Sequence, residues 1–567
     1  MGLLGAVIAA GCTTADLPLT GPRAGGAAAG AAPGAAGSMG GGPGGAGTSN
    51  GGALAGGTAS SGPAYLPVRV RRLTDDEWRA SAFALFGVNS MTAATFTPDS
   101  TQTGFAVNDG QQVDPVLAGQ IDTAAHEIAA GAAALSSTAP CADPTTGGEA
   151  CAKSFIATLV PLAYRRPAVQ AELDGLLVVY HAAADGGAYT DGIQAVIAAV
   201  LDSPGFIYVT EMGSATGDTV NMTDFEIASE LSYLLTGNPP DSTLTSAAQA
   251  GQLQSAANRQ SQARRLLKTT NAQTQLTKVI EQWLGIDSVA QIAKDTTVYA
   301  NFANLAPAMK AEADAYISEI VWNEGKGVAE LFGANWTIAS ASLASFYGAP
   351  APDATGRVSL AGTGRTGILD QGAFLSVYAH ASESGPVLRG VAILRNVACV
   401  TIPDPSSLNI VVVPPTPDPT KTTRQRYAVH ATDPVCASCH TQIDSVGFAF
   451  ENFDGEGQLR TTDATPPQPV DSTTTVATST ADLGNSYADS AALGAAIANS
   501  AAVRQCFARK MFQYAAARND SDTTVKAAED AFISTWNALP QVSQNSLIEV
   551  LVAYAGSPAF ITRKVVP

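Results

Sequence analysis

The sequence has few charged residues and no cluster of basic ones. Only 14% of its 567 residues are charged, against about 25% in an average soluble domain, and the formal net charge is −18. An acidic surface of this kind repels the phosphates of nucleic acids and anionic lipid headgroups. We therefore expect no nucleic-acid partner.

Long hydrophobic runs and the common nucleotide-binding and hydrolase motifs are also missing. After residue 12, no stretch reaches the ~20 uninterrupted apolar residues that a membrane span needs. No Walker loop, dinucleotide fingerprint, HExxH or GxSxG motif stands in a supporting context. These absences argue against a nucleotide cofactor and against the familiar hydrolases. The length predicts roughly two to four folded units.

The N-terminus is typical of a bacterial export signal. Met1–Gly11 is a short apolar run that ends in small residues, and Cys12 follows it. We interpret residues 1–12 as a signal peptide with a lipobox-like end and Cys12 as the lipidated residue. No basic residue precedes the run, so the alternative is a flexible apolar N-terminus with an incidental cysteine.

Residues 13–63 are predicted to form a tether. From Arg23 to Pro63 the chain consists of Gly, Ala, Ser, Thr and Pro with almost no large apolar residue. Such a segment cannot bury enough surface to offset the entropy lost on ordering. We expect it to hold a folded body away from a membrane.

The remaining sequence has the pattern of a mainly α protein. Thr74–Glu77 and Thr223–Glu226 have the spacing of capping boxes that open amphipathic helices. A helical block from Cys151 to Leu201 is broken at Arg165–Pro167. Strand signals are sparse, with a short one at Val400–Ile402. We expect several small helical modules rather than a sheet-based fold.

The most specific motif is Cys436-Ala-Ser-Cys439-His440. Two thiols three residues apart can add to the two vinyl groups of haem, and the following imidazole then binds the iron. A thioredoxin-like pair requires a strand before the motif, and a structural zinc site requires further ligands nearby. A plain disulfide leaves the histidine unexplained. We therefore predict one covalent c-type haem, attached through Cys436 and Cys439 with His440 as proximal iron ligand.

The seven cysteines agree with an exported protein. Setting aside Cys12 for lipid and two for haem leaves four, an even number, as an oxidising compartment favours. Cys141 and Cys151 flank a short loop and are predicted to pair. Cys399 and Cys506 are then predicted to join the haem region to the C-terminal helices, although four cysteines allow three connectivities.

The order of motifs from about residue 68 onward resembles the planctomycete-type cytochrome family, multi-domain bacterial lipoproteins built from domains of unknown function. The motifs that carry this resemblance are Arg71–Trp78 with Leu85–Gly87, Tyr164–Pro167 with Ser203–Phe206, Asp224–Leu235 with Gln282–Gly285, Gly367–Leu369 with Ser384–Gly390, Cys436–His440 with Ile443–Asp454, and Val503–Tyr514. The resemblance implies a haem-bearing module but no established reaction.

The motifs and helical blocks together suggest a division of the folded chain. We expect four helical modules around one that bears the CxxCH motif. Their predicted ranges are 64–140, 141–215, 216–350, 351–475 for the haem-bearing module, and 476–567 for the C-terminal module.

The sequence does not identify the second iron ligand. By chemistry the candidates are Met511, His380 and His430. Met511 lies in a helical stretch where core packing is the alternative role, and His380 has the alternative of a polar surface residue. His430 precedes Cys436 by only six residues, so it reaches the opposite haem face only through a sharp chain reversal. An open distal position is therefore a further alternative.

Several neighbouring residues are candidates for contacts with the haem. Phe448, Phe450 and Phe453 follow the motif and either pack on the porphyrin edge or form an ordinary hydrophobic turn. Arg389 and Arg395 are candidates for pairing with the haem propionates, by charge alone.

The leading functional hypothesis is electron transfer in the periplasm or at the outer membrane by an exported lipoprotein with an unidentified redox partner. Its membrane contact is expected through the lipid anchor only. One alternative is a haem peroxidase- or oxygenase-like enzyme with an open distal site. The other is a surface-binding scaffold, for polysaccharide, in which haem is auxiliary. The length favours the alternatives, because an electron carrier needs only about 100 residues.

Overall fold

The computed structural model describes residues 65–133, 148–185, 188–214, 217–408, 415, 418–477, 481–518 and 523–565. The predicted signal peptide, the tether, Cys12 and Cys141 lie outside these residues. Within the described ranges, no helix is both long enough and apolar enough to cross a membrane.

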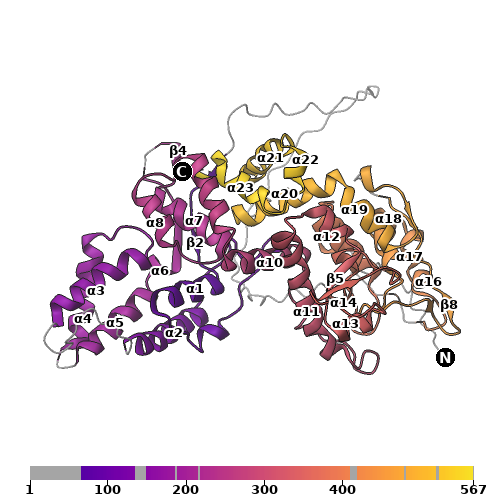
Figure 1. Ribbon diagram of the computed structural model, residues 1–567, viewed down its shortest axis with the longest axis horizontal. Helices are drawn as coiled ribbons and strands as arrows, with labels where there is room; N and C mark the ends of the chain where they lie inside the picture. Colours follow the sequence, from indigo (N-terminus) through magenta and orange to yellow (C-terminus); the bar gives the residue numbers. More distant parts are fainter. Residues whose placement is uncertain are drawn as a thin grey trace, which may run out of the picture. The chain divides into compact units, whose positions relative to one another are not determined.

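Helices dominate the folded chain, as expected from the sequence (Figure 1). The first of them share a hydrophobic core. At its centre the Trp78 ring meets Phe96 and Phe206 edge-on, with centroid distances of 5.2 and 5.8 Å. The helices of this core are α1 (Asp75–Phe86), α2 (Pro115–Ala133), α3 (Gly148–Ala163), α4 (Gln170–Ala184), α5 (Tyr189–Leu201) and α6 (Pro204–Ile207).

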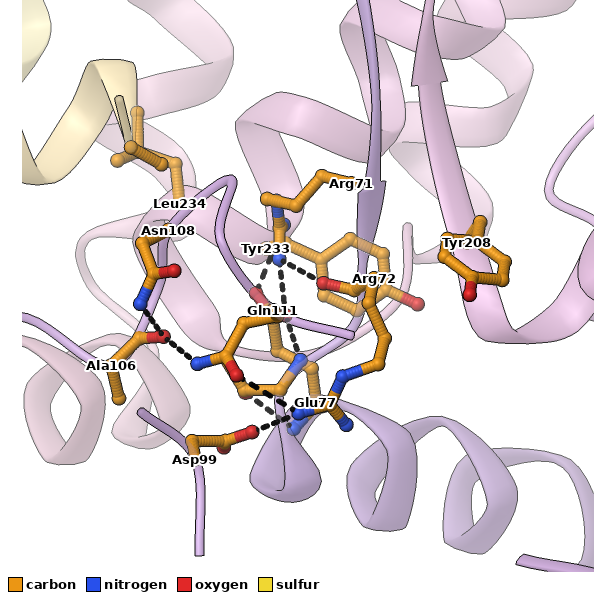
Figure 2. Close-up of polar contacts among 12 residues, drawn as sticks. Arg71, Arg72, Glu77, Asp99, Ala106, Asn108, Gln111, Tyr208, Tyr233 and Leu234 are labelled. Carbon is orange, nitrogen blue, oxygen red and sulfur yellow. Dashed lines mark hydrogen bonds and ion pairs between the residues drawn. The ribbon is translucent and has the colours of Figure 1, made fainter. Parts of the chain in front are cut away.

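The start of α1 shows why the first motif has its composition. Thr74 and Glu77 form the predicted capping box, each side chain bonding the other residue's backbone N–H. Glu77 also accepts two hydrogen bonds from the Arg71 guanidinium, at 2.6 and 3.2 Å. Arg72 contacts Asp75, Asp99 and Gln111. Figure 2 draws Arg71 with Glu77, and Arg72 with Asp99 and Gln111. The charges of this motif therefore serve the fold.

The break at Arg165–Pro167 also lies where the sequence predicts it, between α3 and α4. Arg165 has a φ of 57°, in the left-handed region that side chains rarely adopt. Its buried guanidinium donates to the carbonyls of Ala163, Gly205, Phe206 and Tyr208 at 2.8–3.0 Å. One side chain thus joins the Tyr164–Pro167 motif to the Ser203–Phe206 motif.

A larger hydrophobic core lies among the helices that follow, and all but two short ones contribute residues to it. The second predicted capping box, at Thr223 and Glu226, opens α7. These helices are α7 (Asp224–Thr236), α8 (Ser242–Gln249), α9 (Ala256–Leu266), α10 (Thr270–Leu284), α11 (Phe302–Ser318), α12 (Val328–Gly333), α13 (Ala341–Phe346), α14 (Gly372–Val377), α15 (Pro386–Ala392), α16 (Thr423–Tyr427), α17 (Val429–Thr432), α18 (Pro434–Gly447), α19 (Ser490–Asn499), α20 (Ala501–Ala516), α21 (Thr523–Asn537), α22 (Gln541–Gln544), α23 (Glu549–Gly556) and α24 (Pro558–Ile561).

The strands are short and pair in small sheets. Val400–Ile402 is not among them, because the Ile402 carbonyl accepts from the Arg395 guanidinium instead of a neighbouring strand. The strands are β1 (Leu66–Pro67), β2 (Arg69–Arg72), β3 (Tyr208–Glu211), β4 (Thr219–Asn221), β5 (Trp336–Ile338), β6 (Arg357–Ser359), β7 (Thr462–Asp463), β8 (Gln468–Pro469), β9 (Thr474–Thr475), β10 (Ser486–Tyr487) and β11 (Thr562–Lys564).

The first and last of these strands are neighbours. β1 pairs in parallel with β11, which pairs antiparallel with β4, while β2 pairs antiparallel with β3. Glu211, at the end of β3, is buried and lies within 2.5–3.3 Å of the guanidinium groups of Arg69, Arg518 and Arg563. Burial opposes ionisation of Glu211, but the three cations outweigh it and lower its pKa well below the usual value.

One predicted disulfide is confirmed. Cys399 and Cys506 are joined, across a sequence separation of 107 residues, and the bond links the segment after α15 to α20. Cys151 is disulfide-bonded as well, and its predicted partner Cys141 lies outside the described residues. Disulfides persist in oxidising compartments, so the bond indicates an extracytoplasmic protein.

Candidate cofactor site

The CxxCH motif occupies the first turns of α18. Asp433 is the N-cap, and its carboxylate accepts from the backbone N–H groups of Val435 and Cys436 at 2.8 and 3.2 Å. Pro434 follows at the first helical position, where its missing N–H costs nothing. Positions i, i+3 and i+4 share one face of a helix. The motif's two sulfurs and its imidazole therefore lie on the same side of α18.

The two sulfurs of the motif are not joined to each other. Cys439 is a free thiol and is half-buried. Cys436 is buried and disulfide-bonded. Attachment of a cofactor through both sulfurs therefore requires that the Cys436 disulfide be reduced first.

His440 belongs to a buried cluster with His430 and Asp444. The Asp444 carboxylate lies 2.9 Å from Nδ1 of His440 through one oxygen and 2.9 Å from Nδ1 of His430 through the other. Both imidazoles are almost fully buried, at 3% and 0% exposure. Burial opposes ionisation of Asp444, but the hydrogen bonds from the two histidines outweigh it and lower its pKa. The cluster has the composition of a metal-ligand or ligand-orienting group.

The imidazole ring of His430 lies against that of His440. The short helix α17 and the turn at Asp433 bring the two rings together, with centroids 3.8 Å apart and planes at 46°. That separation is van der Waals contact and leaves no room for a porphyrin between the rings. In this arrangement His430 supports His440 instead of facing it across a haem.

A cavity of about 690 Å³ opens beside His440. Its volume is within the ~300–1,000 Å³ range of small-molecule and cofactor sites. The lining comes from α16 to α18 and from the segment that contains β9 and β10, and it combines aromatic, hydroxyl and charged groups. These residues are Arg424, Tyr427, Ala428, Ala431, His440, Thr441, Asp444, Ser445, Phe448, Asp471, Thr473, Thr474, Thr475, Ser486 and Tyr487.

The predicted distal ligands are not among the residues that line this cavity. Met511 is buried in α20 as part of the larger core, at 2% exposure. His380 is half-buried after α14, its carbonyl accepts from Lys294 Nζ at 2.8 Å, and burial lowers its pKa. A role in iron binding stays a prediction for both.

The arginines singled out from sequence are occupied elsewhere. Arg389 is fully buried and donates to four backbone carbonyls, those of Leu375, Phe450, Phe453 and Asp454. These bonds fix the chain that follows α18, so the expectation of a propionate contact is wrong for Arg389. Arg395 bonds the Ile402 carbonyl, as described above.

The three phenylalanines after the motif all belong to the larger core. Phe448 also lines the cavity, while Phe450 and Phe453 are completely buried. The Arg424 guanidinium lies 4.4 Å from the centre of the Phe448 ring, a cation–π contact at the cavity wall. Arg424 also donates to the backbone carbonyls of Asp471 and Thr473 at 2.9 and 2.8 Å.

Sequence reasoning missed two parts of this site. Asp444 is four residues after His440 on one helix, a spacing that brings side chains into contact and was the available signal. The wall from Asp471 to Tyr487 carries no motif, because two-residue strands leave no periodicity to recognise.

Four family models match successive parts of the chain. They are PSD3, a protein of unknown function (DUF1587), at residues 71–134, PSD5, a protein of unknown function (DUF1595), at 151–211, PSD4, a protein of unknown function (DUF1592), at 222–349, and PSCyt3, a protein of unknown function (DUF1588), at 365–463. The last match contains α16 to α18. No curated protein and no solved structure matches the chain.

Proposed function

Because the chain belongs to the planctomycete cytochrome-type family assembled from these four domains, we propose that it carries one covalent c-type haem at Cys436, Cys439 and His440. The observation that carries the proposal is the position of His440. It is a buried imidazole that follows the two cysteines on one helix face and lines a large cavity. Thioether attachment to paired cysteines followed by histidine suits this arrangement.

The donor set fits such a group. The carboxylate of Asp444 takes the Nδ1 side of His440 and leaves Nε2 as the atom for iron. Tyr427 and Phe448 supply aromatic walls to the cavity. Arg424 lines the cavity, so we assign the propionate contact to it in place of Arg389 and Arg395; a propionate there would compete with its ion pair to Asp471. A bound haem would supply one-electron redox chemistry, and these residues would bind and orient it.

The first function we assign is electron transfer in the cell envelope. The disulfide between Cys399 and Cys506 supports an oxidising compartment. Anchoring through lipidated Cys12, with residues 13–63 as tether, is part of the proposal and agrees with the apolar run before Cys12. The redox partner is a separate electron donor or acceptor.

A second candidate is a haem that binds small ligands at an open distal position. It is favoured by the cavity lining. Among the described residues that line the cavity, His440 is the single histidine and none is a methionine. A site without a second strong iron ligand binds CO or peroxide.

The test is spectroscopic and uses the full chain exported through a cytochrome-maturation system. We expect a pyridine haemochrome spectrum of c type with one haem per chain, and none in a Cys436→Ser/Cys439→Ser variant. A haem indifferent to CO supports the electron carrier, and a CO-difference spectrum supports the open site. Colourless wild-type protein, produced beside a control cytochrome that matures normally, contradicts both.

A further inference from the structure

The imidazole ring of His440 is held through its Nδ1 atom. Its Nδ1 lies 2.9 Å from a carboxylate oxygen of Asp444, and the side chain is 3% exposed. A carboxylate only accepts hydrogen bonds, so Nδ1 carries the hydrogen and the lone pair of the neutral ring lies on Nε2. The tautomer required of an iron ligand is therefore set by the protein before any cofactor arrives.

Asp444 is itself held from the other side. Its second oxygen lies 2.9 Å from Nδ1 of His430, which is completely buried. The His430 ring in turn packs against Tyr427, edge-on, with centroids 5.2 Å apart. Both carboxylate oxygens are thus engaged, and Asp444 has no free rotation that would release His440.

We propose that Asp444, with His430 behind it, is a positioning residue that orients His440 and raises the basicity of its Nε2. The inference rests on the proposed haem attachment. Metal-ligating histidines that donate their other N–H to a carboxylate are stronger donors and are fixed in orientation. A stronger proximal donor favours the oxidised iron, so Asp444 holds the reduction potential low.

The same helix provides a matched control. Asp433 carries the same charge, lies at the N-cap of α18 and bonds only backbone N–H groups in its contacts with Val435 and Cys436. Asparagine caps a helix about as well as aspartate. Asp433→Asn therefore removes one negative charge near the site without touching either imidazole, while Asp444→Asn removes it from the cluster.

The first experiment measures the midpoint potential of the haem-loaded full chain. Asp444→Asn is expected to raise the potential clearly more than Asp433→Asn does. His430→Ala is expected to shift it in the same direction by less, because Asp444 keeps its contact with His440. Equal shifts for Asp444→Asn and Asp433→Asn would overturn the inference while leaving haem attachment intact.

The second experiment needs no haem. The chain has five histidines, so ¹⁵N-histidine labelling of the full-length Cys436→Ser/Cys439→Ser variant gives a spectrum that can be assigned by substitution. We expect the His440 nitrogens to report a single Nδ1–H tautomer and to become a tautomer mixture in Asp444→Asn. Unchanged His440 shifts would overturn the inference. Haem-free wild-type protein with the expected tautomer would instead reject the proposed function alone.

Discussion

The second module and the CxxCH region use their motif residues in opposite ways. In the region of α3 to α6, which is the predicted second module, the Arg165 guanidinium donates to four backbone carbonyls and joins the Tyr164–Pro167 and Ser203–Phe206 motifs. At the CxxCH motif, His440 receives support on one nitrogen only and lines a cavity of about 690 Å³. The same chain therefore contains motifs that complete the fold and one motif that leaves a ligand atom available.

This difference separates motif residues that stabilise the fold from motif residues that line a site. A buried arginine whose hydrogen bonds all go to carbonyls is a structural residue, as Arg165 and Arg389 are. A buried histidine that a carboxylate orients toward a cavity is a site residue. Loss of a residue of the first class should lower the free energy of unfolding. Loss of a residue of the second class should change the cofactor content.

The largest effect is expected from Glu211→Gln. Three guanidinium groups lose their carboxylate partner in a buried site. Breaking a buried ion pair typically costs about 3–5 kcal/mol, so we expect a loss of this size in the free energy of unfolding by urea. Because the pKa of Glu211 is lowered in the folded state, its contribution is present above the unfolded pKa and is lost as the pH falls through the folded pKa.

Glu549→Gln is the matched control for this measurement. Glu549 pairs with Arg264 at the surface, where side-chain exposures are 32% and 53%. Exposed pairs contribute only about 0–1 kcal/mol. Similar losses for the two variants would show that the Glu211 cluster does not join the strands as described.

The next effect is expected from removing the Cys399–Cys506 bond. The bond closes a long loop, since its cysteines are 107 residues apart. A Cys399→Ser/Cys506→Ser variant should lose about 2–4 kcal/mol of stability. Cys439→Ser, which removes a free thiol, is the control in haem-free protein and should leave the unfolding midpoint unchanged. If the unfolding midpoint moves equally in both variants, the Cys399–Cys506 bond does not stabilise the chain as we expect.

Arg165→Met and Arg424→Met compare the two regions directly. Arg165→Met leaves buried carbonyls without a donor and should cost about 2–3 kcal/mol. Arg424 is about one-third exposed, at 34%, so Arg424→Met should cost less than about 1 kcal/mol. The second variant should nevertheless change the potential or retention of the haem, and the first should not. Thermal unfolding and haem content are measured on the same samples. If Arg424→Met costs more stability than Arg165→Met, and only Arg165→Met changes the haem, the contrast between the two regions is wrong.

A further effect concerns pH and is spread over several pH units. Glu312 is fully buried, and burial raises its pKa to about 7 in spite of hydrogen bonds from Tyr347 and Thr337. Between about pH 4.3 and 7 the folded chain keeps a proton that the unfolded chain releases. Stability should therefore fall as the pH rises through that window, by at most about 1.4 kcal/mol per pH unit. Glu312→Gln should reduce this slope in urea unfolding series and leave the part due to other buried carboxyls, such as Asp370, whose pKa burial also raises to about 7. If the dependence of stability on pH is unchanged in this variant, the pKa of Glu312 is not raised as described.

Much of the fold was predictable because it depends on local signals. The capping boxes at Thr74 and Thr223, the helix break at Arg165 and the order of the domain motifs all lie where the sequence places them. Cysteine counting left three connectivities, and the predicted Cys399–Cys506 bond is confirmed. These features depend on residues that act over a few positions or on simple counting.

The rest depends on contacts that no local pattern encodes. The pairing of β1 with β11 joins the first and last strands through two residues each. Arg389 and Arg424 carry the same charge and both donate to backbone carbonyls, but Arg389 is fully buried and only Arg424 lines the cavity. The role of His430 required knowledge of the turn that brings it 3.8 Å from His440.

The proposed function depends on a haem that is bonded to the cysteines of α18. Its most direct test is peptide mass mapping of full-length protein exported through a cytochrome-maturation system. We predict that the peptide containing Cys436, Cys439 and His440 carries the mass of one haem on two thioether bonds. An unmodified peptide, from cells in which a control cytochrome acquires its haem, would contradict the account.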